Sequence, residues 1–226
     1  MADALVVLQL DTRFPRVPGD IACPETYSLP MRIEIVPKAQ VADVVSADPE
    51  ALDITGFVSA VAAADAKVVS TSCGFLAYFQ KALAARTEKT FLSSALVALP
   101  TLRARFRDEE ILILTFDAQV LGAPAYSRAL DGFEGPVVGL KKSMHLYKVI
   151  SEDLKHLDFQ QAEADIDELV CSALSRSPGI RAILLECTNL PPYKHIIRRH
   201  FAGEITDCLT VLESACAGLV KEEFLR

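Results

Sequence analysis

Apolar runs of strand length alternate with amphipathic stretches along the whole chain. The runs are rich in Val, Ile and Leu, as buried parallel strands are, and the stretches between them place apolar residues at helical spacing. Strands are predicted at residues 4–10, 31–36, 68–72, 90–93, 111–116, 136–140 and 182–186. Helices are predicted at residues 48–64, 76–86, 96–106, 119–130, 159–175, 191–200 and 207–224. Strands that alternate with helices of this length predict parallel βαβ units and an α/β fold.

The pattern restarts near the middle of the chain. Asp11 ends the first predicted strand and Cys73 a later one, and in the second half Asp117 and Cys187 occupy the corresponding places. Apolar strands recur in every α/β protein, but two matched landmarks favour a duplication over coincidence. The expected lobes are residues 1–98 with 206–226, and residues 99–205.

Cys73 and Cys187 close two similar units, in which an apolar strand ends at a polar residue, a cysteine and a small residue, and a helical pattern follows. The partial positive charge at a helix start would lower the pKa of each thiol and favour the thiolate. If the halves face each other, one cysteine can remove a proton from a carbon that bears a carboxylate while the other returns a proton to the opposite face. The alternative is a buried structural cysteine, the interpretation given to Cys171, Cys208 and Cys216.

Other polar side chains also follow predicted strands, where sites form in open α/β sheets. Asp11 and Asp117 are candidates to orient a thiol or to receive an ammonium group, although Asp also favours strand-end turns. Ser93, Ser94 and Thr115 are candidates to donate hydrogen bonds to a carboxylate, or else to cap local backbone. These positions and the two cysteines are expected to converge on one cleft.

Composition and charge narrow the class of protein. Of the 226 residues, 51% are hydrophobic, enough for a substantial core, and a formal net charge of −7 argues against a nucleic-acid surface. The start carries Asp3 where a signal peptide would be basic, and no segment has the roughly 18–20 apolar residues of a membrane span. We therefore expect a cytoplasmic protein with reduced cysteines and with neither nucleic acid nor membrane as a partner.

The sequence carries no recognisable metal or nucleotide motif. The four histidines, His145, His156, His195 and His200, lack an HExxH or comparable spacing, and there is no GxGxxG fingerprint or P-loop. No metal site and no cofactor are therefore expected. The basic run at residues 194–200 is expected to form a solvated helix face.

Three motifs resemble those of the aspartate/glutamate racemase superfamily, which also includes hydantoin racemases, arylmalonate decarboxylases and maleate isomerases. They are Thr71-Ser72-Cys73-Gly74-Phe75-Leu76, Ser93-Ser94-Ala95-Leu96 and Glu186-Cys187-Thr188-Asn189-Leu190-Pro191-Pro192-Tyr193. The opening, with Leu10-Asp11-Thr12-Arg13-Phe14-Pro15 and Pro18-Gly19-Asp20, resembles one bacterial branch of the superfamily. The resemblance spans nearly the whole chain, and its most specific motif surrounds the second cysteine.

The resemblance implies two pseudo-symmetric flavodoxin-like lobes with parallel sheets, an interlobe cleft and a possible homodimer. It also implies proton transfer by the two cysteines without a cofactor. Residues beside the cysteines would hold the substrate carboxylate, and they correspond here to Gly74, Phe75, Thr188 and Asn189. Glutamate racemases have Asn-Thr after the first cysteine and Thr-His after the second, so these residues argue against L-glutamate as the substrate.

The function predicted from the sequence is a racemase or epimerase of a small carboxylate such as an amino acid, an isomerase that uses Cys73 and Cys187 as acid and base. The alternative enzyme is a lyase or cis–trans isomerase of the same superfamily, of the arylmalonate decarboxylase or maleate isomerase type, that depends chiefly on one cysteine. A third interpretation is a small-carboxylate binding protein that does no chemistry. The racemase needs both thiols, the lyase or isomerase chiefly one, and the binding protein neither.

Overall fold

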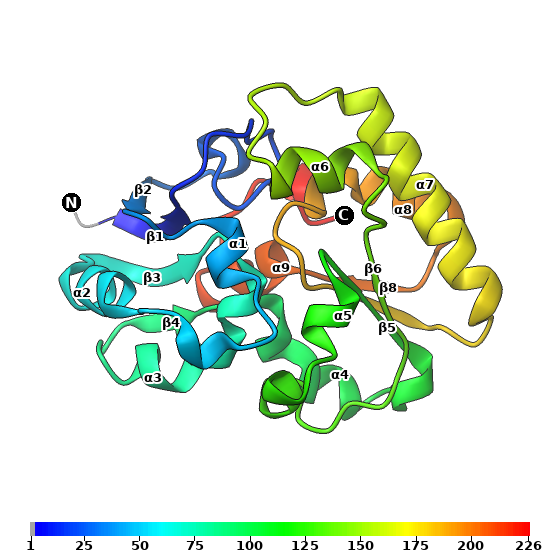
Figure 1. Ribbon diagram of the computed structural model, residues 1–226, viewed down its shortest axis with the longest axis horizontal. Coiled ribbons are helices and arrows are strands. Elements are labelled where there is room, and N and C mark those ends of the chain that lie inside the picture. The colour runs from blue at the N-terminus through cyan, green and yellow to red at the C-terminus, as the bar shows by residue number, and fades with distance from the viewer. Residues whose placement is uncertain (1–2) are drawn as a thin grey trace.

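Two four-stranded parallel sheets form the centre of the computed structural model, which describes residues 3–226 (Figure 1). The first sheet contains β1 (Asp3–Leu10), β2 (Met31–Val36), β3 (Ala66–Thr71) and β4 (Thr90–Leu92), in the order β2-β1-β3-β4. The second contains β5 (Ile111–Thr115), β6 (Val137–Gly139), β7 (Ala182–Leu185) and β8 (Glu204–Thr206), in the order β6-β5-β7-β8. The two sheets therefore share one strand order, which confirms the predicted α/β class with two flavodoxin-like lobes. The predicted lobe boundaries remain a prediction.

The central strands of both sheets are apolar because they are covered on both faces. All five residues of β5 and all four of β7 are buried, and β1 is buried from its second residue onward. Residues of both sheets, among them Leu8, Val69, Leu114 and Leu184, belong to one continuous apolar core. The parallel strands β5 and β7 are paired with Leu114 opposite Leu185, so they end at the same edge of the sheet. The residues that follow the two strands therefore lie close together at that edge.

Helices cover the sheets, and most are short. They are α1 (Val41–Val44), α2 (Thr55–Ala63), α3 (Gln80–Ala84), α4 (Leu99–Arg103), α5 (Ala118–Leu121), α6 (His145–Ser151), α7 (Phe159–Arg176), α8 (Lys194–His200) and α9 (Cys208–Ala215). Several predicted helices begin instead as 3₁₀ turns, including η3 (Gly74–Phe79), η4 (Ala95–Ala98) and η7 (Pro191–Tyr193). The last predicted helix ends at Ala215 rather than at Phe224, since the chain turns at Gly218, which has a φ of +77°.

The final helix returns from the second sheet to the first. Leu209 and Leu212 of α9 pack in a second apolar cluster with Val7 and Val68 of the first sheet. Just before α9, the Asp207 carboxylate accepts a hydrogen bond from the Thr210 backbone N–H at 2.9 Å and so caps the helix. The C-terminal segment is therefore an integral part of the layer over the first sheet.

The prediction that residues 194–200 form a solvated helix face is wrong for the first of them, Lys194. Lys194 is buried, and its Nζ lies 2.8 Å from the buried Asp207 Oδ2. Lys194 also donates a hydrogen bond to the backbone carbonyl of Phe224. Because α8 packs under the C-terminal segment, a charge that looks like part of a basic surface in the sequence instead joins two buried elements.

No helix within residues 3–226 is long and apolar enough to cross a membrane. Within the same residues, no group of three or more His, Cys, Asp and Glu side chains could hold a metal ion.

Candidate active site

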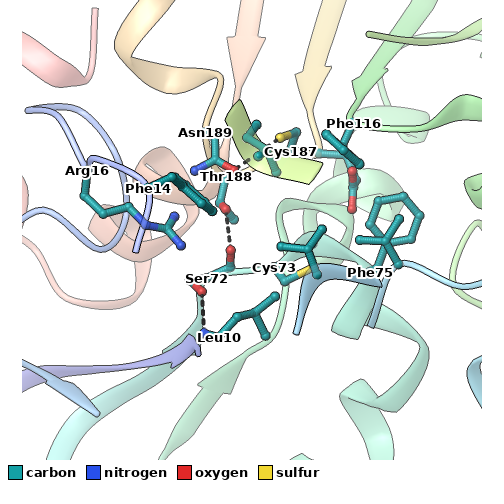
Figure 2. Close-up of a pocket in the computed structure, with 15 residues that line it drawn as sticks. Leu10, Phe14, Arg16, Ser72, Cys73, Phe75, Phe116, Cys187, Thr188 and Asn189 are labelled. Carbon is teal, nitrogen blue, oxygen red and sulfur yellow. Dashed lines mark hydrogen bonds between the residues drawn. The ribbon is translucent and has the colours of Figure 1, made fainter. Parts of the chain in front are cut away.

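A pocket lies where the carboxyl ends of the two sheets meet, and residues from both halves of the chain line it (Figure 2). Its free space, including the part open to solvent, is about 350 Å³. The lining residues are Leu10, Phe14, Arg16, Val41, Val45, Ser72, Cys73, Gly74, Phe75, Phe116, Ile150, Glu186, Cys187, Thr188 and Asn189. Most of this wall is apolar, so the few polar groups in it define the chemistry.

Cys73 is separated from the end of β3 by Ser72 alone and precedes η3 in an extended conformation. Its loop is tied to β1, because Ser72 Oγ accepts a hydrogen bond from the Leu10 backbone N–H at 3.0 Å. Burial, with a smaller contribution from the charge of Glu186, raises the pKa of the Cys73 thiol to about 12. The expected lowering of this pKa is therefore wrong: the short 3₁₀ turn offers little dipole, and desolvation outweighs it.

Cys187 occupies the corresponding place beyond β7. Its Sγ donates a weak hydrogen bond to Asn189 Oδ1 at 3.8 Å, and burial, followed by the charge of Glu186, raises its pKa well above the usual value. The next residue, Thr188, donates from Oγ1 to the backbone carbonyl of Ser72 at 2.7 Å. This bond joins the two cysteine loops, and in Figure 2 both cysteines lie to the right of it, Cys187 above and Cys73 below.

A loop from the first half of the chain supports the second cysteine. Asp20 accepts a hydrogen bond from Asn189 Nδ2 at 2.6 Å and forms an ion pair with Arg16 at 3.3 Å. The loop can approach this closely because Gly19 has a φ of +96° and an added Cβ there would come within 2.9 Å of Pro192 Cα. The Pro-Gly-Asp and Pro-Pro motifs in the sequence are therefore the two sides of one contact.

Arg16 is the cation of the pocket. Its side chain is 10% exposed, and the guanidinium lies 4.1 Å from the centroid of the Phe14 ring. Nη2 donates to Thr12 Oγ1 at 3.2 Å, while Nε is buried without a hydrogen-bond partner. A buried guanidinium with a free N–H is well suited to bind a carboxylate.

Glu186 is the anion of the pocket. The residue has no solvent-exposed surface, and its Oε2 accepts a hydrogen bond from Thr115 Oγ1 at 2.6 Å. Its Oε1 is buried without a partner. Burial raises the pKa of this carboxyl to about 7, against the opposing effect of the Thr115 hydrogen bond. Glu186 packs directly on Gly74, where an added Cβ would lie 2.0 Å from Oε1.

Aromatic rings form much of the remaining wall. Phe75 packs edge-on against Tyr126 with ring centroids 5.5 Å apart, and Phe116 stacks on Tyr147 at 4.6 Å. Figure 2 shows Phe75 and Phe116 on the side of the pocket opposite to Arg16 and Phe14.

The structure brings most of the predicted site residues to the pocket, but not all of them. Those that line it are Cys73, Gly74, Phe75, Cys187, Thr188 and Asn189. Thr115 reaches it only through Glu186, and the other three lie outside the lining. Asp11 accepts a hydrogen bond from the Lys38 backbone N–H, Ser93 donates to Gln80, and Ser94 caps η4. The capping alternative therefore describes Ser94, as it does Asp117, which caps α5, whereas Asp11 and Ser93 bond segments distant in the sequence.

Sequence reasoning missed Arg16, Glu186, Phe14 and Phe116 as pocket residues. A signal was present for Glu186, since an acid at the end of an otherwise apolar strand is buried only with a reason. No comparable signal marks Arg16, which lies in a loop and reaches the pocket through tertiary packing.

Comparisons with known proteins give two kinds of relatives, although no family model matches the sequence. A dimethylsulfoniopropionate lyase from Durusdinium sp. clade D is 26% identical over 96% of this chain and 75% of its own length. Dimethylsulfoniopropionate lyases 5 and 3 from Emiliania huxleyi are 27% and 25% identical over 93% and 96% of this chain. The chain spans 44% and 60% of the lengths of these last two relatives.

Similar solved structures cover nearly the whole chain at low sequence identity. Unliganded arylmalonate decarboxylase has a TM-score of 0.62 at 18% identity, covering 98% of this chain and 97% of its own. Picrophilus torridus aspartate racemase has a TM-score of 0.58 at 12% identity, covering 97% of each chain. Allantoin racemase from Pseudomonas fluorescens has a TM-score of 0.57 at 15% identity, covering 93% and 88%.

These findings correct the function predicted from the sequence. The racemase and isomerase prediction is wrong, because the curated relatives that match nearly the whole chain are lyases, whereas the racemases are similar at the level of the fold. One fold can host several chemistries, so motifs shared across a superfamily do not identify the reaction. The chain shares its fold with aspartate racemase, allantoin racemase and arylmalonate decarboxylase, in agreement with the resemblance of its cysteine motifs.

Proposed function

We propose that this chain is a lyase that cleaves a small β-substituted carboxylate by elimination, with dimethylsulfoniopropionate as the candidate substrate. The observation that carries the proposal is the match to dimethylsulfoniopropionate lyases over 93–96% of the chain. The pocket supports it, because two thiols, a buried arginine and several phenyl rings surround one small space. The lyase alternative drawn from the sequence is thus the one that we carry forward.

The candidate substrate carries a carboxylate at one end and a dimethylsulfonium cation at the other, separated by two methylene groups. A base removes a proton from the carbon next to the carboxylate, and the electron pair forms a double bond to the β carbon. The carbon–sulfur bond breaks, and its electron pair leaves with dimethyl sulfide. The products are acrylate, dimethyl sulfide and one proton, so the reaction needs no oxidant or reductant.

Cys73 is the base in this proposal. The backbone N–H groups of Phe75 and Leu76 and the charge of Arg16 each favour its thiolate, although burial raises the pKa further than they lower it. A sulfonium cation that enters the pocket supplies a positive charge near Cys73. This charge stabilises the thiolate, so the bound substrate itself promotes ionisation of the thiol. The proton that Cys73 removes then returns to solvent when the products leave.

Cys187 remains a thiol and acts as a donor. Its S–H already points to an amide oxygen, that of Asn189, and its pKa is raised well above the usual value. When the proton leaves the substrate, negative charge develops on the carboxylate, and the thiol can donate a hydrogen bond to it. Arg16 and the residues beside the cysteines, Thr188 among them, hold the carboxylate at this end of the pocket.

The proposal is tested by incubating the purified protein with dimethylsulfoniopropionate and measuring dimethyl sulfide in the headspace by gas chromatography. We expect release by the wild type, loss of release in Cys73→Ser, and unchanged release in the matched control Cys208→Ser. Cys208 is equally buried but lies on α9, outside the pocket lining. The proposal would be contradicted if the wild type released no more dimethyl sulfide than buffer alone while a cooperative thermal unfolding transition showed that the protein was folded.

A further inference from the structure

One buried group in the pocket has no partner that accounts for it. Glu186 is fully buried, its Oε2 is satisfied by Thr115, and its Oε1 has no partner at all. A buried acceptor without a donor is costly, and a buried carboxylate without a counter-charge is more so. Since Glu186 lines the pocket, the missing partner is one that a ligand can supply.

The charged groups of the pocket lie at opposite ends. Glu186 bonds Thr115, which precedes Phe116, and packs on Gly74, which precedes Phe75. Glu186 is therefore at the end that Phe75 and Phe116 enclose, and Figure 2 shows these two rings across the pocket from Arg16. The guanidinium and the carboxyl are not paired with each other, because Arg16 bonds Asp20 instead.

We infer that Glu186 is the counter-charge for a cationic group of the ligand, and that the pocket selects zwitterions that carry a carboxylate and an onium group. The carboxylate binds at the Arg16 end, and the onium group lies against Oε1 of Glu186 between the rings of Phe75 and Phe116. Aromatic faces attract onium cations, so the rings and the carboxyl act together. This inference rests on the proposed function and deepens it, since it names the part of the substrate that Glu186 recognises.

The ionisation of Glu186 makes the inference testable by pH. The titratable groups that its charge affects are Cys73, Cys187 and Tyr126, and the ion pair of Arg16 with Asp20 belongs to the opposite end of the pocket. Burial raises the pKa of both thiols and of the phenol, so these three are neutral near pH 7, and Arg16 is already paired. Glu186, with a pKa of about 7, is thus the group whose charge changes as the pH rises through neutrality. Onium binding should strengthen over that range.

The experiment compares two ligands of the same shape by isothermal titration calorimetry. Dimethylsulfonioacetate carries S⁺ where 3-methylbutanoate carries CH, and neither has a leaving group on a β carbon, so neither can undergo the elimination. At pH 8 we expect the wild type to bind the sulfonium acid about tenfold tighter than its carbon isostere or better. Glu186→Gln should reduce that preference to less than about threefold while the affinity for the carbon isostere stays the same.

A second variant guards against a merely structural effect. Thr115→Val removes the donor to Oε2, so the pKa of Glu186 should rise, and the pH at which onium binding strengthens should move upward. A preference for the sulfonium acid that Glu186→Gln retains, or the absence of any preference in the wild type, would overturn the inference. If the wild type cleaves dimethylsulfoniopropionate but Glu186→Gln retains the preference for the sulfonium acid, only the inference about Glu186 is overturned and the proposed lyase activity is supported. A preference that depends on Glu186 without cleavage would support the inference and contradict the lyase.

Discussion

The units that end in Cys73 and Cys187 have the same backbone plan but different surroundings. In both, a buried parallel strand leads to a cysteine and a short 3₁₀ turn. The charge of Glu186 raises the pKa of both thiols, but the remaining neighbours around Cys73 include the ring of Phe75. Around Cys187 they are polar groups in a chain of bonds that runs through Asn189 to Asp20.

This difference bears directly on the chemistry. A racemase needs two cysteines that exchange the roles of acid and base, which is easiest when their surroundings are alike. An elimination needs one base and a group that stabilises the charge left behind, so unequal surroundings suit it. The pseudo-symmetric fold therefore carries an asymmetric site, and each prediction below tests one side of that asymmetry.

The largest effect is expected from replacing the two cysteines separately. Cys73→Ser should lower kcat for dimethylsulfoniopropionate cleavage by about 10³-fold or more, because it removes the base. Cys187→Ala should lower kcat less, by about 10²-fold, because it removes one donor to the developing charge. Steady-state assays of acrylate formation give both values. Equal losses would contradict the assignment of unequal roles.

Gly74, the residue after Cys73, gives the second test. Gly74→Ala places a Cβ 2.0 Å from Glu186 Oε1, so the fully buried carboxyl must move and activity should fall about 10²-fold. Gly179→Ala is the matched control, because nothing lies within 4 Å of the added Cβ there. Assays and thermal unfolding of both variants should separate them. If Gly74→Ala keeps full activity, the close contact between the two cysteine units has no role in catalysis.

Glu186 gives a third test, through stability. Its pKa is raised from about 4.5 to about 7 in the folded protein, so its protonated form stabilises the fold below pH 4.5 and this contribution is lost as the pH rises through 7. Relative to Glu186→Gln, the wild type should lose up to about 3 kcal/mol between pH 4.5 and pH 8. Urea unfolding without ligand at several pH values measures this. If the difference in the free energy of unfolding between the two proteins did not change with pH, the pKa of the Glu186 carboxyl would not be raised in the folded protein.

The smallest effect is expected in the polar network around Cys187. Asp20→Asn keeps the shape but removes the charge that holds Arg16 and Asn189. We expect KM for dimethylsulfoniopropionate to rise by about threefold to tenfold, with kcat changed by less than about threefold. The reason is that Arg16 and Asn189 remain present but are no longer held in place to bind the substrate carboxylate. A large loss in kcat with an unchanged KM would place Asp20 in the chemical step instead.

Part of this account follows from the sequence. Continuous apolar runs, without alternating polar residues, predict the buried parallel strands. The matched cysteine units predict that Cys73 and Cys187 meet at one pocket. The pKa of the cysteines was predicted in the wrong direction, because the sequence shows a turn after each strand but not the desolvation around it. Arg16 enters the pocket through the turn at Gly19, a tertiary contact that no local pattern reveals.

The reaction itself was the other part that local patterns could not give. The cysteine motifs resemble those of a superfamily that includes racemases and decarboxylases, and the groups on which the proposed elimination depends are neighbours in space. Glu186 and Phe116 are such neighbours, and they come from different strands of the second sheet. Their proximity to Cys73 depends on how the two sheets pack.

The most direct test of the central claim is proton NMR of the purified protein with dimethylsulfoniopropionate in deuterium oxide. The account predicts that acrylate and dimethyl sulfide appear in equal amounts with the wild type and not with Cys73→Ser. Exchange of the proton next to the carboxylate for deuterium without any acrylate would show a base but no elimination. That result, or cleavage that persists in Cys73→Ser, would contradict a lyase that uses Cys73 as its base.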